Sequence, residues 1–462
     1  MRHSSSSAKC SKIPSALLLS AVALFIASRF SEAGDFPPKL PGDKLVVSVK
    51  SADLLAVPSS LKPKSEYTVA KTPPEVDVLY YPEQNYPGNP WSDWGEGLFA
   101  SNGKYYSSIG DHMDAAKNSP LSEGHAYVYE YDPETKKLRT VVSVSKVLKL
   151  PKGHYKPGKV HTRIDEGSDG WLYFATHRGA SRATADKYHY KGDWIFRYHP
   201  KDMKTEVLGR PMSKHALPCG QLDPKSMIFY CQSINGLDAA VKEKQLVAYD
   251  VKARKTLYAG GPVPSGGRAF ILTKESKCYY DSGGFLYRYD PSTPDKAPVK
   301  ACAIPQSLTI RAATRESKEG ICYAVTSRRS GILLAFHTKT EKFEVIGPAA
   351  VGQRDYITTL DLDPTERYLY YMPGAHGRSS DDGTPVIQFD LKTKKKKVIA
   401  FLADALDRAT GFIPQGTFGS ALDDKGATLF ITWMGHRSDY PRKGRFEVCA
   451  LTAVKIPASE RP

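Results

Sequence analysis

Long apolar stretches are almost absent from this chain of 462 residues. The one near the N-terminus, residues 13–27, is shorter than the roughly 20 residues that a membrane-spanning helix needs. No helical hydrophobic period separates the short apolar segments that follow, which argues against a helical protein. We therefore expect an all-β body that is soluble, with no transmembrane segment once the N-terminal segment is removed.

Methionine and cysteine are scarce, at seven residues each, whereas tyrosine is abundant at 27. Aromatic and β-branched side chains fit the pleated, half-buried surface of a strand, so this balance favours β-structure over helices. A Cys-x-x-Cys-His sequence is also missing. Covalently attached haem is therefore excluded.

Acidic residues are outnumbered by basic ones, 49 against 65, which gives a formal net charge of +16. Such a charge favours a polyanionic partner, which can be nucleic acid, an anionic lipid surface or an acidic polysaccharide. Because export is predicted below, we expect an anionic polysaccharide and no nucleic acid. The lysine run at residues 394–397 falls on a strand-connecting hairpin, and we interpret it as a solvated turn rather than a binding patch.

The first 33 residues have the organisation of a secretory signal peptide. A basic start precedes the apolar core, and Ser31, Glu32 and Ala33 form a small-residue cleavage site. Cleavage there leaves one domain, residues 34–462, in a secreted or periplasmic protein that we expect to be a monomer. An uncleaved N-terminal anchor is the alternative, and the short apolar core argues against it.

A short pattern recurs along the body of the chain. An apolar strand ends in Tyr or Phe, Asp or His follows, and a polar turn comes next. Successive copies lie between 40 and 67 positions apart, which is typical of one four-stranded propeller blade with loop insertions. The copies begin at Tyr131, Tyr198, Tyr249, Tyr289, Phe336 and Phe389.

Each copy joins two outer strands, and a second hairpin with turn-forming residues precedes it. Two hairpins per period make a four-stranded blade, and seven such blades predict a β-propeller rather than a sandwich or a solenoid. The last blade lacks a fourth strand, so we expect residues 67–81 to supply it and close the ring, which removes an exposed sheet edge. The inner hairpins are predicted at residues 95–112, 160–177, 217–233, 268–281, 308–327, 356–374 and 415–434.

Histidine and arginine gather at one end of these inner hairpins. The first strand of a blade begins, and the second ends, on the same face of a propeller, so residues at these positions meet around the central channel. Histidine exchanges protons or binds metals near neutral pH, and arginine holds carboxylates or sulfates, so we expect an anionic ligand there. The alternative is that each histidine only caps a strand. The residues predicted on this face are His112, His161, His177, Arg178, Arg268, Arg311, Arg328, His376 and His436.

The sharpest constellation is the pair His161 and His177, which stand at the two open ends of one inner hairpin. An exported propeller with a histidine pair on one blade and arginines around the channel resembles the seven-bladed ulvan lyases and, more loosely, the oligogalacturonate lyases. The resemblance implies a polysaccharide lyase that cleaves uronate-containing chains by β-elimination. It implies proton transfer by histidine and tyrosine, here His161 and His177 for the histidines, while arginine neutralises the uronate carboxylate.

The resemblance also implies a tyrosine and an arginine from the following blade, near residues 218–221 and 233–235. Neither residue type stands there. Arg178 or Arg268 could replace the arginine. Three tyrosines could replace the tyrosine: Tyr105, Tyr106 and Tyr356.

Four residues could form a tetrahedral zinc site: His215, Cys219, Cys231 and Cys278. Cys219 and Cys231 lie symmetrically about one hairpin turn, and His215 is close to them in sequence. Buried free thiols or, in an exported protein, a disulfide are the alternatives. The resemblance implies a comparable structural zinc, and no other cofactor is predicted.

Three functions therefore remain open. The first is a secreted lyase acting on an ulvan-like polysaccharide. The second is a non-catalytic propeller that binds a protein or an anionic glycan, and the third is a metal- or quinone-dependent enzyme that uses the same face. Propellers host all three, so the fold alone does not choose between them.

Overall fold

Short β-strands make up most of the regular structure of the protein. The computed structural model describes residues 38–84, 93–111, 123–266, 268–327, 331–439 and 446–461, all within the unit Ala33–Pro462. The predicted export segment, residues 1–33, lies outside the described residues, as do His112 and Arg328. In the described part of the chain, no helix is long and apolar enough to cross a membrane.

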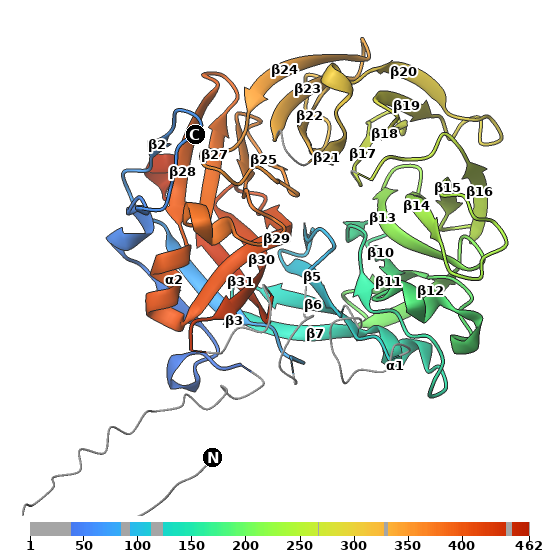
Figure 1. Ribbon diagram of the computed structural model, residues 1–462, viewed down its shortest axis with the longest axis horizontal. Coiled ribbons are helices and arrows are strands. Elements are labelled where there is room, and N and C mark those ends of the chain that lie inside the picture. Colours follow the sequence, from blue (N-terminus) through green and yellow to red (C-terminus); the bar gives the residue numbers. More distant parts are fainter. Residues whose placement is uncertain are drawn as a thin grey trace, which may run out of the picture. The chain divides into compact units, whose positions relative to one another are not determined.

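Seven antiparallel sheets stand side by side in a ring, with the first strand of each sheet innermost (Figure 1). The all-β, seven-bladed propeller predicted from the repeat is therefore confirmed. The predicted inner hairpins coincide with the first two strands of the seven sheets. We number the blades 1 to 7 along the chain.

Blades 1 to 3 differ in how regular their innermost strand is. In blade 2 this strand is interrupted after Val160, so that two short strands, β8 and β9, both pair with β10. At the interruption the backbone N–H of His161 still donates to the carbonyl oxygen of Ala175 (3.3 Å), whereas that of Arg163 donates to Gly220 of blade 3 (3.0 Å). The strands are β4 (Leu98–Phe99), β5 (Tyr105–Gly110), β6 (Ala126–Asp132) and β7 (Lys137–Ser143) in blade 1; β8 (Lys159–Val160), β9 (Asp165–Glu166), β10 (Leu172–His177), β11 (Ile195–His199) and β12 (Lys204–Gly209) in blade 2; and β13 (His215–Asp223), β14 (Ile228–Asn235), β15 (Gln245–Asp250) and β16 (Lys255–Gly260) in blade 3.

Blades 4 to 6 follow the same plan, and blade 6 gains a short extra strand, β2 (Thr68–Val69), on its outer edge. This strand runs parallel to β28, whereas the strands within each blade are antiparallel. The strands are β17 (Phe270–Leu272), β18 (Cys278–Ser282), β19 (Phe285–Tyr289) and β20 (Val299–Ala303) in blade 4; β21 (Ile310–Ala313), β22 (Ile321–Thr326), β23 (Ile332–His337) and β24 (Lys342–Pro348) in blade 5; and β25 (Asp361–Leu362), β26 (Tyr368–Tyr371), β27 (Pro385–Asp390) and β28 (Lys395–Phe401) in blade 6.

Blade 7 closes the ring with an N-terminal strand, as predicted. Its own strands are β29 (Phe412–Leu422), β30 (Thr428–Arg437) and β31 (Val448–Lys455), and β3 (Glu75–Tyr80) pairs with β31, with β1 (Val47–Val49) outside it.

The closing strand is shorter than the predicted segment of residues 67–81. Pro73 and Pro74 precede β3 and have no backbone N–H to donate, so they break the segment in two. The first part becomes β2 and joins blade 6 instead.

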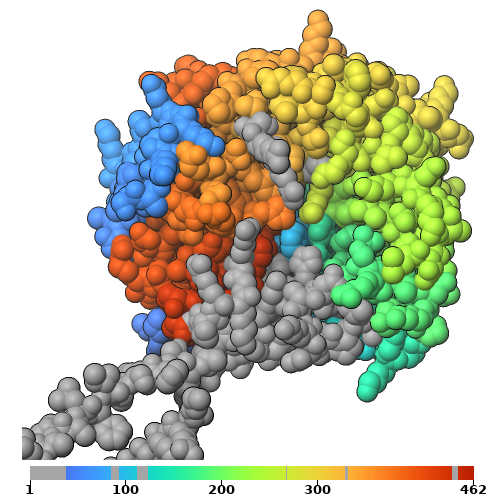
Figure 2. Space-filling model, viewed as in Figure 1, coloured from blue at the N-terminus to red at the C-terminus, as the bar shows by residue number. Residues whose placement is uncertain are grey.

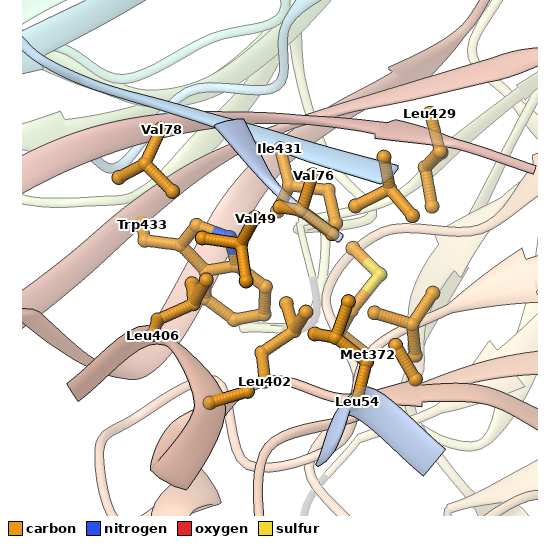
Figure 3. Close-up of a cluster of buried hydrophobic side chains, with 14 of the residues drawn as sticks. Val49, Leu54, Val76, Val78, Met372, Leu402, Leu406, Leu429, Ile431 and Trp433 are labelled. Carbon is orange, nitrogen blue, oxygen red and sulfur yellow. The ribbon is translucent and has the colours of Figure 1, made fainter. Parts of the chain in front are cut away.

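The core is divided into clusters of buried apolar side chains between neighbouring blades. Figure 3 shows the cluster between blades 6 and 7, where Trp433 of β30 packs with Val76 of β3 and Leu406. Tyrosine and phenylalanine dominate the next cluster, between blades 7 and 1. The helices among the described residues are two short α-helices, α1 (Val144–Leu148) and α2 (Ala403–Thr410), with 3-10 turns at Pro41–Asp43, Ala52–Leu55, Ser181–Thr184, Asp186–Tyr188, Pro305–Ser307, Ser379–Asp382 and Ala458–Glu460.

Candidate functional site

Side chains from opposite sides of the ring meet at its centre. The guanidinium of Arg268, just before β17 of blade 4, lies 5.9 Å from the ring centre of Trp94, just before β4 of blade 1. It also lies 5.8 Å from the ring of Phe418 on β29 of blade 7. Blade 4 stands across the ring from both partners (Figure 1), so these contacts place the residues at the central axis. We call the group the central cluster: Trp94, Lys159, His161, His177, Arg268, Arg311, Tyr356, His376 and Phe418.

Irregular backbone in the innermost strands aims several of these side chains at the axis. The ladder of β21 shifts register between Ile310 and Ala312, which puts Arg311 in a bulge. The ladder of β29 shifts between Thr417 and Gly419, which puts Phe418 in another. A bulged residue leaves the in-and-out alternation of its strand, so its side chain can be redirected. In blade 2, His161 directly follows β8, at the interruption between β8 and β9.

The aromatic rings of the central cluster contact one another in series, some stacked face to face and others tilted or edge-on. His161 lies parallel to Trp94, with ring centres 5.7 Å apart, and His376 lies parallel to Tyr356 at 5.0 Å. Phe418 joins the two pairs, at 4.8 Å from Trp94 and 5.3 Å from His376. The carboxylate of Asp93 accepts the backbone N–H of Phe418 (3.4 Å), which ties blade 1 to blade 7.

Three cations lie against these rings. Besides Arg268, the ammonium of Lys159 is 4.4 Å from the Trp94 ring centre, and the guanidinium of Arg311 is 5.3 Å from that of Phe418. Attraction between a cation and the face of an aromatic ring stabilises this arrangement. Arg311 also donates from Nε to the hydroxyl oxygen of Tyr356 (3.0 Å).

The members of the central cluster differ in exposure. Lys159, His161, Arg311 and Phe418 are buried, whereas the side chains of three other members are partly exposed. These accessible members are Arg268, Tyr356 and His376.

The predicted histidine pair is in contact. Lys159 pairs with His177 in the ladder, and the rings of His161 and His177 have centres 4.7 Å apart. Nδ1 of His161 bonds to the carbonyl oxygen of Pro218. A carbonyl oxygen only accepts, so Nδ1 carries the proton and Nε2 of the neutral ring keeps its lone pair. Burial, with Arg268 and His177 nearby, lowers the pKa of His161 well below its ordinary value, which favours this neutral form.

One step farther along the channel lies an ion-paired layer. Arg163 contacts the carboxylates of Glu96 (2.5 Å) and Asp165 (3.4 Å). Burial raises the pKa of Asp165 and of Asp361 to about 6, and Arg163 opposes the rise. Here arginine has carboxylate partners. Arg311, by contrast, makes no ion pair with an acidic residue anywhere in the described ranges.

Two other predicted site residues, Arg178 and His436, stand at the ends of β10 and β30. Arg178 follows β10, but its guanidinium donates to the carbonyl oxygen of Asn235 (3.1 Å) in blade 3. It therefore belongs to the contact between blades 2 and 3, and its predicted role as the carboxylate clamp is not supported by its position. His436 is buried at the matching end of β30, where it pairs with Ile413. The central cluster thus contains five of the predicted residues: His161, His177, Arg268, Arg311 and His376.

Of the three candidate tyrosines, only Tyr356 lies in the central cluster. Tyr105 and Tyr106 are fully buried in β5. The hydroxyl of Tyr105 contacts Thr432 (3.0 Å), and that of Tyr106 donates to Glu130 (2.7 Å). Tyr106 is thus bonded within blade 1, and Tyr105 contacts blade 7.

The four predicted zinc ligands do not come together. The turn that pairs Asp223 with Ile228 sets a register in which Cys219 pairs with Gln232 and Cys231 pairs with Gly220, so the two cysteines are not opposite each other. Cys219 then packs with Cys278 between blades 3 and 4, while Cys231 packs between blades 2 and 3. Nδ1 of His215, at the start of β13, lies 2.8 Å from the carbonyl oxygen of Ser213.

No group of three or more His, Cys, Asp or Glu side chains suited to a metal ion occurs among the residues that the structure describes. The six cysteines in this part of the chain are free thiols, five buried and one, Cys302, half-buried.

Sequence reasoning missed three members of the central cluster: Trp94, Lys159 and Phe418. Trp94 stands four positions before β4, so it is not at the end of a predicted strand. Phe418 reaches the axis only through a bulge that no turn residue announces. Lys159 was within reach, because it begins the first strand of blade 2.

Comparison with known proteins adds no functional assignment. No protein-family model matches the chain, and no curated protein matches it. Similar solved structures include a chain of the "Crystal Structure of Mitotic Checkpoint Complex", with 10% identity over 87% of this chain and 97% of that one, at a TM-score of 0.49.

Two further structures are similar at a TM-score of 0.47. The RRP9 WD40 repeats have 9% identity over 82% of this chain and 100% of that one. U3-55K has 10% identity over 81% of this chain and 98% of that one. We draw nothing about function from these likenesses. The class of the protein, a seven-bladed β-propeller, follows from its own sheets.

Proposed function

We propose that the central cluster binds the acid group of a carbohydrate, so that the protein is a propeller that binds an anionic glycan. The observation that carries the proposal is the convergence of Lys159, Arg268 and Arg311 on aromatic rings from several blades. A carboxylate or sulfate bound there would gain charge-assisted hydrogen bonds. Arg311 supports this role because it has no acidic partner among the described residues.

The aromatic rings favour a sugar over a small inorganic anion. Flat ring faces bury apolar surface and pack against the C–H face of a sugar, while polar groups at the rim fix its orientation. Tyr356 and His376, which are partly exposed, offer such a face. The formal net charge of +16 would attract a polyanionic chain. We further propose that residues 1–33 direct export, which would bring the protein to extracellular or periplasmic glycans.

Cleavage by β-elimination is the second candidate, and one contact favours it. Arg311 holds the hydroxyl of Tyr356 at 3.0 Å, beside the imidazole of His376. A guanidinium there would neutralise a uronate carboxylate and make the proton on C5 more acidic. Nε2 of neutral His161 would then accept that proton, and the C4–O4 bond would break as Tyr356 gave its proton to O4. The products would be a chain with a free hydroxyl and an unsaturated uronate.

Calorimetry with paired oligosaccharides tests the binding proposal. An acidic tetrasaccharide of uronate units should bind, and a neutral tetrasaccharide of equal length should not. Arg311→Met should weaken binding of the acidic tetrasaccharide. Arg178→Met, which removes an arginine just after β10 of blade 2, should leave this binding unchanged. Equal affinity for the two sugars, or equal effects of the two variants, would refute the proposal.

Product absorbance tests the second candidate. Ulvan, pectate and alginate should be incubated with the protein while the ultraviolet absorbance of an unsaturated uronate is followed. His161→Gln and Tyr356→Phe should each abolish the rise without abolishing binding. Binding with no rise on any of the three polymers would leave a glycan-binding protein without lyase activity.

A further inference from the structure

The lysine run at residues 394–397 begins in the turn before β28, and Lys394 and Lys395 are exposed, as predicted for a solvated turn. Its first three residues line a cavity of about 700 Å³ together with residues of the N-terminal segment. The opposite wall includes Ser65, Glu66 and Tyr67. We call this cavity the lysine groove.

The wall is held in place by pairing and by side-chain hydrogen bonds. Thr68 of β2 pairs with Lys397 of β28, and Val69 pairs with Val398. Just before this pair, the hydroxyl of Ser65 donates to the carbonyl oxygen of Ala350 (2.7 Å). Figure 2 shows the blue N-terminal residues lying against the orange residues of blade 6. The chain leaves the edge of β28 before Thr68, and the groove opens where the pairing stops.

The groove is lined by more positive than negative charge. Lys394 and Lys395 are exposed, and the ammonium of Lys394 is 3.9 Å from Glu344. Within the described residues, Lys395 makes no ion pair. Lys396 is buried, and its ammonium donates to the carbonyl oxygen of Pro348 (2.8 Å). Glu66 is the single acidic residue in the lining.

An aromatic side chain stands among these lysines. Tyr67 lines the groove and is half-buried. Lysines bind an acid group as mobile point charges, and a tyrosine ring supplies apolar surface for the flat face of a ring-shaped unit. The volume of the groove lies within the range of about 300 to 1,000 Å³ that small-molecule sites occupy.

The same hairpin in blade 3 provides an internal control. There Asp250, Lys252 and Lys255 occupy the positions of Asp390, Lys392 and Lys395. In both turns the aspartate accepts the backbone N–H two positions on. Blade 3 has no added outer strand such as β2, so its lysines face no second wall.

We propose that the lysine groove is a second binding site for an acidic polysaccharide, about one or two sugar units long and separate from the central axis. The inference rests on the proposed function, because both sites would take the same class of polymer. Two sites on one protein raise the affinity for a long chain through effective concentration, and a short chain that fills only one site gains nothing. The presence of Tyr67 favours a glycan over an anionic lipid surface.

The test compares two variants with the same change of charge. Lys394→Gln/Lys395→Gln removes two groove lysines, and Lys252→Gln/Lys255→Gln removes two lysines from the corresponding hairpin of blade 3. Binding is measured by calorimetry with an acidic tetrasaccharide and by surface plasmon resonance on an immobilised acidic polysaccharide. We expect the groove variant to bind the long chain about tenfold more weakly and the tetrasaccharide with unchanged affinity. The blade 3 variant should match the unmodified protein on both.

Each other result has a distinct meaning. Equal loss for the two lysine variants would overturn the proposal, because net charge alone would explain it. The proposal would also be overturned if the unmodified protein bound single-stranded DNA as tightly as the acidic polysaccharide and the groove variant lost this DNA binding. The groove would then be a nucleic-acid site. If the tetrasaccharide failed to bind but the long chain bound through the groove, the proposed function of the central cluster would fail and the groove would stand. Tyr67→Ala, with its melting temperature checked, should reproduce the loss.

Discussion

Two consecutive residues of β10 belong to two very different buried polar centres. His177 joins the central cluster, whereas Thr176 faces the opposite way and donates to Asp193 (2.9 Å). Tyr155 (2.9 Å) and Tyr190 (3.1 Å) donate to the same carboxylate. We call these four residues, Tyr155, Thr176, Tyr190 and Asp193, the Asp193 network. Successive side chains of a strand point to opposite sides, so one strand serves both centres.

The two centres differ in the kind of partner that their charged groups have. Both carboxylate oxygens of Asp193 accept hydroxyl hydrogen bonds within the blade. In the central cluster, positive groups lie over aromatic rings, and Arg311 pairs with a phenol instead of a carboxylate. A buried polar network whose groups are all hydrogen-bonded stabilises the fold, whereas the cation of Arg311 has a neutral partner and keeps its charge for an acidic ligand.

The largest expected effect comes from breaking the Asp193 network. Asp193→Ala leaves three buried hydroxyls without their acceptor, and we expect the free energy of unfolding to fall by about 3 to 5 kcal/mol. Urea denaturation of the variant measures this. The affinity of the remaining folded protein for an acidic oligosaccharide should stay within about twofold. A drop below 1 kcal/mol would show that the network is not structural.

The next largest effect should come from the central cluster. Arg311→Met keeps the apolar volume but removes the cation, so we expect affinity for the acidic tetrasaccharide to fall by about 10- to 100-fold, as for a lost charge-assisted hydrogen bond. Stability should change by less than about 1 kcal/mol, because a buried charge is often replaced by an apolar side chain at little cost. Calorimetry and urea denaturation separate the two readouts. If Arg311→Met lowered the stability but not the affinity, Arg311 would have a structural role instead of a binding role.

The two centres should also respond to pH with opposite signs. Burial raises the pKa of Asp193 to about 6, opposed by its hydroxyl partners and Arg178. The folded state therefore takes up a proton before the unfolded state, and stability relative to Asp193→Asn should rise by about 2 to 3 kcal/mol as the pH falls from 6 to 4.

Histidine at the central cluster should act the other way. The pKa of His161 is lowered, so below about pH 6.5 the unfolded state binds the proton and the folded state does not. Stability relative to His161→Gln should then decrease as the pH falls below 6.5. Urea midpoints of the three proteins between pH 4 and 7.5 measure both trends. Parallel curves for the two comparisons would contradict the assignment of charge states.

The smallest effect should come from Arg178, which lies between the two centres. Its hydrogen bond to Asn235 is lost in Arg178→Met, at an expected cost of about 1 kcal/mol in the free energy of unfolding. Affinity for the acidic tetrasaccharide should change by less than about twofold. A tenfold loss of affinity would return Arg178 to the binding site.

Much of the fold could be predicted because the propeller repeats one local pattern. The tyrosine-ended strands and polar turns located seven blades, and strand direction placed His161 and His177 near each other at the open ends of one inner hairpin, where their ring centres are 4.7 Å apart. Arg268, Arg311 and His376 followed from the same reasoning. These predictions needed only strand direction and the closure of a ring.

The rest depended on single-residue irregularities that leave no clear mark in a sequence. The turn between Asp223 and Ile228 sets a register one position from the symmetrical one, so Cys219 and Cys231 face opposite sides and the predicted zinc ligands separate. A bulge brings Phe418 to the axis. The lysine groove depends on a chain segment more than 300 positions away in sequence, and a hairpin seen alone could only suggest a solvated turn.

The central claim is that acidic groups of a glycan are held by the cations of the central cluster. The most direct test is a crystal structure of the protein with an acidic tetrasaccharide. We expect a carboxylate oxygen within about 3 Å of the guanidinium of Arg268 or Arg311, with a sugar ring against Tyr356 or His376. A tetrasaccharide bound only outside the central axis, with these side chains untouched, would contradict the account.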